Sequence, residues 1–215
     1  RDINIALMNE FPIIFDKLNI NFYDILNAAE TKWNFVKFYP GLVGGHCIGV
    51  DPYYLSYIAK KNNINASLIT AGRNINDNYS KFIFKKIMRI SKFYKQDLKK
   101  INFLIYGLTF KENCPDFRNS KSLDLIKNFM NYKLKFKISD PYISFLNKSQ
   151  LQLYKKYLDD DNYKADFIIY LVAHRDYKKH NFLYFRKKTN SKYIIYDLKK
   201  ILNREKIEYP NIYIN

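Results

Sequence analysis

Gly41-Leu-Val-Gly-Gly-His-Cys-Ile-Gly-Val-Asp-Pro-Tyr-Tyr-Leu55 is the most distinctive segment of the chain. It holds four glycines and one of the two cysteines, and it leads directly into a helical pattern. Glycines at this density allow the backbone to approach a ligand closely, because no Cβ atom intervenes. A cysteine four residues before an aspartate at such a turn predicts a site that offers Cys47 and Asp51 to a substrate. The alternative from the residues alone is a small buried cysteine.

On both sides of this segment the pattern predicts helices. Apolar side chains recur at helical spacing over residues 2–18, where Pro12 predicts a kink, and over 22–30, where Asn21 is suited to cap the helix. Pro52 fits the first turn of a helix over about 53–62. Residues 67–94 predict one long helix, with a possible break near Gly72.

After residue 98 the pattern changes to short apolar runs. Strands are predicted at 101–106, 134–138, 166–173 and 193–198, with a helix at 120–131 between the first two. Strands separated by helix-sized spacers are typical of a parallel sheet covered by helices. We therefore expect a mixed fold: an all-α domain over residues 1–98, followed by an α/β domain with a parallel sheet over residues 99–215.

Composition narrows the functional classes. The net charge is +17, but lysine pairs are spread along the whole chain instead of forming one block, so we expect no nucleic-acid partner. No apolar run is long enough to span a membrane. Two cysteines without metal-ligand spacing argue against a disulfide framework or a metal site and favour the reducing cytoplasm. Because the sequence starts inside a helical pattern without Met, we expect a piece of a longer polypeptide.

A second polar loop, Gly107-Leu-Thr-Phe-Lys-Glu-Asn-Cys-Pro-Asp-Phe-Arg-Asn-Ser120, follows the first predicted strand. The carboxyl edge of a parallel sheet is where α/β folds bind ligands. Lys111 and Arg118 are therefore candidate phosphate-binding residues, although a solvated surface loop would look the same. Cys114 is interpreted as structural. Asp140, before Pro141, is interpreted as a turn residue, the alternative being a ribose-binding acid.

At these two loops the sequence resembles the UDP-glucose and GDP-mannose dehydrogenase superfamily, and most closely its UDP-N-acetylhexosamine 6-dehydrogenases. The resemblance covers nearly the whole chain. The segments that carry it are Ile5-Ala-Leu-Met-Asn-Glu10, Thr31-Lys-Trp-Asn-Phe35, Pro40 to Leu55, Ala71-Gly-Arg-Asn-Ile-Asn-Asp77, Gly107 to Ser120 and Ala173-His-Arg175.

The resemblance implies oxidation of the C6 alcohol of a UDP-sugar to a carboxylate with two NAD, as part of surface-polysaccharide biosynthesis. Cys47 matches the nucleophile, which carries a thiohemiacetal and then a thioester, and Asp51 matches the acid associated with the hydrolytic water. Arg118 matches an arginine that reaches toward the cofactor. The positions that match substrate-binding residues are Phe38, Tyr39, Gly41, Leu42, Val43, Gly44 and Lys111.

Two departures qualify this resemblance. Val50 stands where the UDP-glucose branch has lysine, which favours the N-acetylhexosamine branch. The amino-terminal cofactor domain and the catalytic lysine and asparagine of the family lie before the first residue of this sequence. The resemblance therefore implies a helical dimerisation domain that forms a homodimer, followed by a Rossmann-like UDP-sugar-binding domain, with NAD bound mainly elsewhere. The alternative is a non-catalytic fragment that only dimerises or binds UDP-sugar.

Overall fold

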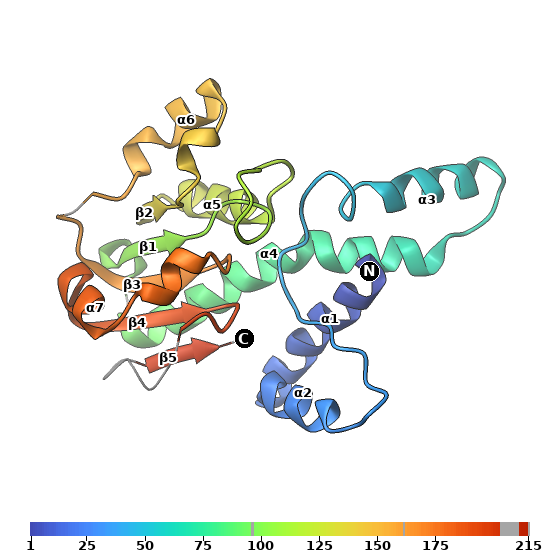
Figure 1. The fold of residues 1–215 in the computed structure, drawn as a ribbon, viewed down its shortest axis with the longest axis horizontal. Helices are drawn as coiled ribbons and strands as arrows, with labels where there is room; N and C mark the ends of the chain where they lie inside the picture. Colours follow the sequence, from blue (N-terminus) through green and yellow to red (C-terminus); the bar gives the residue numbers. More distant parts are fainter. Residues whose placement is uncertain (96, 161, 203–210, 215) are drawn as a thin grey trace.

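The structure is a computed structural model that describes residues 1–95, 97–160, 162–202 and 211–214. Its first part is helical and its second part is built on a sheet (Figure 1). The helices of the first part are α1 (Asp2–Leu18), α2 (Phe22–Glu30), α3 (Asp51–Lys61) and α4 (Ser67–Tyr94).

The sheet is parallel throughout, as the sequence predicted. Among the described residues its strands are β1 (Asn102–Tyr106), β2 (Lys135–Ser139), β3 (Ala165–Tyr170), β4 (Thr189–Asp197) and β5 (Asn211–Ile214). They lie in the order β2-β1-β3-β4-β5, and each neighbouring pair is parallel. The chain winds outward in both directions from β1 and β3. In doubly wound folds the ligand site lies at this switch point, beyond the carboxyl ends of the strands.

Helices cover both faces of the sheet because side chains alternate along each strand. In β1, Phe103 and Ile105 face the layer that contains α5 (Lys121–Asn131) and the second half of α4, and Leu104 and Tyr106 face the layer that contains α7 (Phe182–Lys188). All four side chains are buried. A further short helix, α6 (Lys148–Tyr154), joins the α4–α5 layer through Tyr154.

Helix α4 connects the two parts of the molecule. Helix α1 packs along it, and the second half of α4 also packs against one face of the sheet, behind the strands in the view of Figure 1. The helix runs unbroken through Gly72, where the sequence suggested a possible break. A Cβ at Gly72 would lie 2.8 Å from Ile3 Cδ1 of α1, so the missing side chain serves close helix packing.

Several other boundaries differ from the prediction. Helix α3 begins at Asp51, two residues earlier than expected, and β3 ends at Tyr170 instead of Ala173. Helices α6 and α7 were not predicted, because each is only seven residues long and starts at an asparagine cap, which gives little apolar periodicity. The predicted cap of α2 is confirmed, since the Asn21 side chain accepts a hydrogen bond from Tyr23 N.

Candidate active site

The two loops that the sequence singled out lie against each other. The backbone N–H of Gly45 donates a hydrogen bond to the Arg118 carbonyl at 3.1 Å, and Asn119 Nδ2 donates to the Gly45 carbonyl at 3.1 Å. The cysteine loop (residues 41–50) is thereby fixed to the loop after β1 (residues 107–120). This contact joins the helical part of the chain to the sheet part at one edge of the sheet.

Two glycines of the cysteine loop permit this contact. A Cβ on Gly44 would lie 2.5 Å from the Asn119 carbonyl oxygen. Gly45 has a φ of +89°, and a Cβ there would lie 2.8 Å from the Phe110 ring. Side-chain-bearing residues rarely adopt such a φ. The sequence suggested that the glycines make room for a ligand, but at these two positions the close neighbour is the chain's own second loop.

A cleft of about 710 Å³ opens beside the two loops. Its walls include the first half of the loop that follows β1, the residues just after β3 and a lysine just after β4, so it lies at the carboxyl edge of the sheet. The sequence-predicted residues that line it are Phe38, Tyr39, Gly41, Leu42, Val43, Gly44, Cys47 and Lys111. The structure therefore brings the candidate nucleophile and the candidate substrate lysine to the same cavity.

Cys47 lies where the cysteine loop turns into α3. Its carbonyl accepts hydrogen bonds from the N–H groups of Val50 and Asp51 at 2.9 and 2.8 Å. The side chain is exposed, and the residue lines the cleft. Cys47 is therefore not a buried packing residue, which was the alternative interpretation of the sequence.

Two predicted residues lie outside the cleft wall. Asp51 is the first residue of α3 and is exposed, one turn beyond Cys47. Arg118 is exposed and forms an ion pair with Asp116 at 2.6 Å, and its Nη2 lies 3.3 Å from His46 Nδ1. The hydrogen bonds from Arg118 lower the pKa of Asp116, and the same contact raises the pKa of Arg118. The structure thus places Arg118 beside the cysteine loop and not within the cavity.

Sequence reasoning missed Lys199, which lines the cleft after the carboxyl end of β4. Its ammonium donates a hydrogen bond to the Pro40 carbonyl at 3.0 Å. Burial lowers the pKa of Lys199, while the charge of Glu112 acts in the opposite direction. The signal that could have found Lys199 is its place directly after the predicted strand at 193–198, at the sheet edge where ligands bind.

Two buried side chains, Asp140 and His174, accept hydrogen bonds from the backbone of the loop after β1 and so hold this loop in place. Asp140 Oδ2 accepts hydrogen bonds from the N–H groups of Leu108 and Thr109 at 2.6 and 3.2 Å. His174 Nδ1 accepts from Asn113 N at 3.0 Å, so the ring proton is on Nε2, which lies 3.2 Å from Asp140 Oδ2. Both side chains are buried. Asp140 thus acts within the fold by supporting a loop of the site.

Two family models match the chain: the central domain of the UDP-glucose/GDP-mannose dehydrogenase family over residues 1–78, and the UDP binding domain of the same family over residues 104–204. The chain belongs to the UDP-glucose/GDP-mannose dehydrogenase family. Both loops of the site fall within these matches.

Curated relatives match nearly the whole of this chain. The chain is 38% identical over 206 residues to a UDP-N-acetyl-D-glucosamine 6-dehydrogenase of Pseudomonas aeruginosa, covering 96% of this chain and 49% of the relative. It is 42% identical over 212 residues to protein CapL of Staphylococcus aureus, with 96% and 49% covered. The chain thus spans about half the length of the curated relatives it matches.

Solved structures of the family share the fold. A UDP-N-acetyl-mannosamine dehydrogenase of Staphylococcus aureus superposes with a TM-score of 0.79 at 27% identity, over 100% of this chain and 48% of that one. An NDP-N-acetyl-D-galactosaminuronic acid dehydrogenase of Methanosarcina mazei gives a TM-score of 0.83 at 19% identity, over 100% of this chain and 47% of that one, which shows a common fold.

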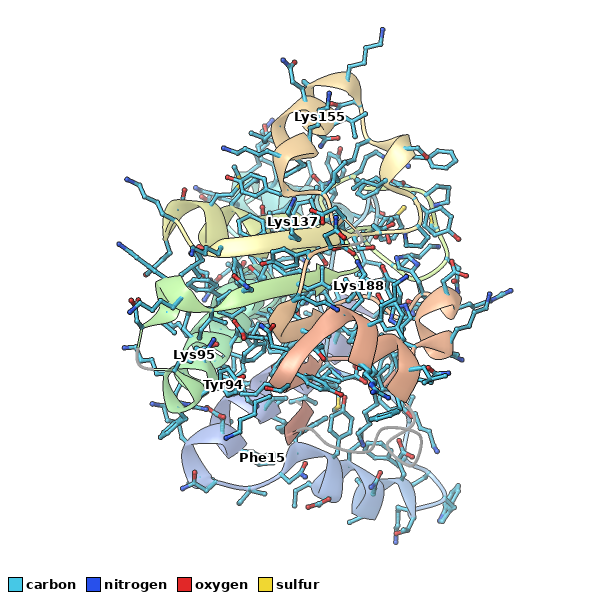
Figure 2. All side chains as sticks on the ribbon, turned by 90° about the vertical axis from the view of Figure 1, so that its left-hand side faces the viewer. Phe15, Tyr94, Lys95, Lys137, Lys155 and Lys188 are labelled. Carbon is cyan, nitrogen blue, oxygen red and sulfur yellow. The ribbon has the colours of Figure 1, made fainter. Side chains whose placement is uncertain are left out.

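The positive charge on the side of the α/β part that faces the viewer in Figure 2 is partly neutralised locally. Lys95, Lys137 and Lys188 are labelled on this side, and each forms an ion pair. Their partners are Asp166 at 3.0 Å, Asp160 at 3.2 Å and Asp159 at 2.8 Å, respectively. Across the described residues no helix has the length and apolar character to cross a membrane, and no three His, Cys, Asp or Glu side chains are grouped to hold a metal.

Proposed function

We propose that this chain forms the sugar-binding and nucleophile-bearing part of a nucleotide-sugar 6-dehydrogenase. Its substrate would be a UDP-N-acetylhexosamine, whose C6 alcohol is oxidised to a carboxylate with two NAD. The observation that carries the proposal is that Cys47 and Lys111, 64 positions apart in the sequence, line one cleft at the carboxyl edge of the sheet. The names of the relatives, which act on UDP-N-acetylhexosamines, support the substrate class.

Cys47 supplies the covalent chemistry in this proposal. After the first oxidation the Cys47 sulfur bonds to the C6 aldehyde carbon and a proton goes to the aldehyde oxygen, which gives a thiohemiacetal. Loss of a hydride from C6 and of the hydroxyl proton then gives a thioester. Water adds to the thioester carbon, the C–S bond breaks, and the carboxylate leaves with the Cys47 thiol restored. NAD, when bound, accepts a hydride in each of the two oxidations. The exposed thiol in the cleft is the feature of this chain that fits these steps.

The cleft also offers positive charge for a diphosphate. Lys111 is exposed on the loop after β1, and Lys199, just after the end of β4, lines the same cavity. Two ammonium groups in one cleft are suited to bind the phosphates of a UDP-sugar. Phe38, Tyr39 and the segment from Gly41 to Gly44 form the wall beside them, and we assign this wall to substrate binding.

For NAD the described residues fit only a contact from one side. The loop after β1 has a single glycine at its start, Gly107, and Arg118 is its exposed cation beside the cysteine loop. Dinucleotide folds hold the pyrophosphate with several glycines at a helix start, which this loop does not provide. We therefore assign Arg118 to a peripheral contact with the cofactor, and the main NAD site to a separate domain of the enzyme.

The proposal also gives Asp51 a role and assigns the two domains. Asp51 lies one turn from Cys47, which suits a residue that orients the hydrolytic water, but its side chain is not part of the cleft wall. Exposed apolar residues on α1 and α3 support a homodimer through the helical domain, which we assign to residues 1–98, with residues 99–215 as the UDP-sugar-binding domain. Two free cysteines agree with a cytoplasmic enzyme of surface-polysaccharide biosynthesis.

Calorimetric titration of the 215-residue chain tests substrate binding. We expect heat from UDP-N-acetylglucosamine or UDP-N-acetylgalactosamine and none from GDP-mannose or NAD alone. Lys111→Met, which keeps the length of the side chain, should weaken UDP-sugar binding about tenfold by removing one charge-assisted contact. Tight NAD binding, or UDP-sugar binding unaffected by Lys111→Met, would contradict the assignment.

Cys47→Ser tests the chemistry once the chain is joined to a cofactor-binding half from the family. The serine hydroxyl is a poor nucleophile at neutral pH, so formation of the uronic acid should stop while UDP-sugar binding persists. Undiminished acid formation would remove Cys47 from the mechanism. Binding without acid formation by the joined wild-type chain would favour the non-catalytic alternative.

A further inference from the structure

A buried polar network lies between α1 and α4, where apolar side chains would suffice for adhesion. It comprises Asp2 and Asn9 on α1 and Arg73 and Asn76 on α4. Asn9 and Asn76 are fully buried, and Arg73 and Asp2 are 2% and 7% exposed. Burying an amide or a charge costs free energy unless hydrogen bonds satisfy it. Such a network therefore calls for a reason beyond helix packing.

The four side chains form one connected set of hydrogen bonds. Arg73 Nη1 donates to Asp2 Oδ1 at 2.6 Å, and Asn76 Nδ2 donates to the same oxygen at 2.8 Å and to the Asp2 carbonyl at 3.0 Å. Asn9 Nδ2 donates to Asn76 Oδ1 at 2.8 Å. Both amide orientations are thus determined by their neighbours, because each donor faces an acceptor.

The network ends on the cysteine loop. Asn9 Oδ1 accepts from Gly41 N at 2.7 Å, and Asn9 Nδ2 donates to the Gly41 carbonyl at 3.0 Å, so one side chain holds both polar groups of a single residue. On the other side of Cys47, Arg73 Nη1 lies 3.5 Å from the Ile48 carbonyl. The loop is therefore held from the helix pair both before and after the cysteine.

Gly41 also lies directly beside Lys199, another residue that lines the cleft. A Cβ on Gly41 would lie 2.0 Å from Lys199 Nζ, and both residues line the cavity together with Cys47. A shift of the Gly41 peptide would therefore move the cleft wall and the start of the cysteine loop at once. Directional hydrogen bonds fix such a position to within tenths of an ångström, which apolar contacts do not.

We propose that Asn9 is a positioning residue, which holds the Gly41 peptide and thereby sets the place of the Cys47 thiol in the cleft. The inference rests on the proposed function, in which Cys47 is the nucleophile. Asn76 and Arg73 act through Asn9 and Ile48 by orienting the amide and closing the network. Misplacement of a reacting group by about 1 Å costs about 100-fold in rate, so a fixed loop matters to the chemistry.

The test compares Asn9→Ala with Asp16→Asn in the 215-residue chain. Asp16 joins α1 to Arg89 of α4 at 2.6 Å, at the end of α1 away from the loop, so its loss weakens the same helix pair without touching the loop. Two readouts follow Cys47: amide hydrogen exchange over residues 41–48, and the rate of alkylation by iodoacetamide relative to Cys114. Urea midpoints of both variants report global stability.

We expect Asn9→Ala to accelerate exchange at Gly41 about tenfold or more, because the amide loses its acceptor, and to change the alkylation rate of Cys47 severalfold. Asp16→Asn should change neither. Equal effects of the two variants, or an unchanged loop in Asn9→Ala, would overturn the inference.

If Asn9→Ala does not fold, exchange in the unaltered chain decides. Protection of the Gly41 amide equal to that of the α4 interior supports the proposal that Asn9 holds the Gly41 peptide. Exchange as fast as in exposed loops refutes it. None of these readouts uses a UDP-sugar. If the cysteine loop responds to Asn9→Ala as expected but the chain binds no UDP-sugar, the proposed function is wrong and the positioning role of Asn9 remains supported.

Discussion

The two parts of the molecule are held together in different ways. The sheet is packed on both faces by fully buried apolar rings and branched side chains, such as Phe103 and Ile169 on one face and Phe185 on the other. The contact between α1 and α4 instead buries Asp2, Asn9, Arg73 and Asn76. Apolar burial supplies free energy without fixing single atoms, whereas a hydrogen-bonded network adds little net stability and fixes positions. The polar packing lies beside the cysteine loop, where position matters.

Truncating the apolar core should give the largest effect. Phe103 is fully buried and packs edge-on against Phe129 and beside Phe167. Phe103→Ala should lower the free energy of unfolding by about 3–5 kcal/mol through lost burial and the remaining cavity. Urea denaturation measures it, with Phe93→Ala as control, since Phe93 is 87% exposed. Equal losses in the two variants would show that the sheet core is misassigned.

Removing the charge at the centre of the helix network comes next. Arg73→Met leaves Asp2 buried without its cation and should cost about 3 kcal/mol, because an unpaired buried charge is strongly unfavourable. Arg89→Met breaks a more exposed ion pair and should cost less than about 1 kcal/mol. The pair of urea midpoints checks this. If Arg73→Met leaves the urea midpoint unchanged, the network is not a connected unit.

Acid should weaken the sheet part through His180, which stacks on Tyr184 and shares a hydrogen bond with the Tyr170 hydroxyl through Nδ1. Burial lowers the pKa of His180 to about 4 from 6.5. Below pH 6.5 His180 is therefore protonated in the unfolded chain but stays neutral in the folded chain. The free energy of unfolding falls progressively down to pH 4. Between pH 7 and pH 5 the loss should be about 2 kcal/mol.

The control for this acid effect is His180→Gln, whose side chain does not titrate. The variant should lose about 2 kcal/mol less than the wild-type chain between pH 7 and pH 5, as measured by urea midpoints at the two pH values. Identical pH dependence in both chains would place the acid sensitivity in another part of the molecule.

The smallest expected change lies at the contact between the two parts. Gly45→Ala forces a side chain into a φ of +89° and against Phe110, and should cost about 1–2 kcal/mol. Gly49→Ala is the matched control, because the nearest atoms to its Cβ would be 3.8 Å away. Thermal unfolding measures both, and the alkylation rate of Cys47 should change in the first variant alone. A silent Gly45→Ala would show that the two loops are not pinned there.

The sequence was sufficient to predict the helices and strands whose apolar residues recur at a regular period. Apolar spacing predicted α4 and the strands β1 to β4, because buried strands and amphipathic helices have regular periods. It did not predict α6 and α7, whose short lengths show no period. It also did not predict the role of Gly72, whose missing side chain leaves room for Ile3 of another helix within an unbroken α4.

The candidate site could be predicted only where the residue type is itself the signal. Cys47 and Lys111 stand out in glycine-rich and polar loops, and the structure places both on one cleft. Lys199 and Asn9 could not be found, since their roles depend on partners 159 and 32 positions away, Pro40 and Gly41. A lysine or an asparagine without such a partner looks the same in sequence.

Protection of Cys47 from alkylation is the sharpest test that this thiol lies in a UDP-sugar site. Iodoacetamide labelling of the 215-residue chain, resolved by mass spectrometry, compares Cys47 in the cleft with Cys114, which is half-buried and outside it. The account predicts that saturating UDP-N-acetylglucosamine or UDP-N-acetylgalactosamine slows labelling of Cys47 and leaves that of Cys114 unchanged. If neither UDP-sugar slows the labelling of Cys47 when it is bound, this prediction is contradicted.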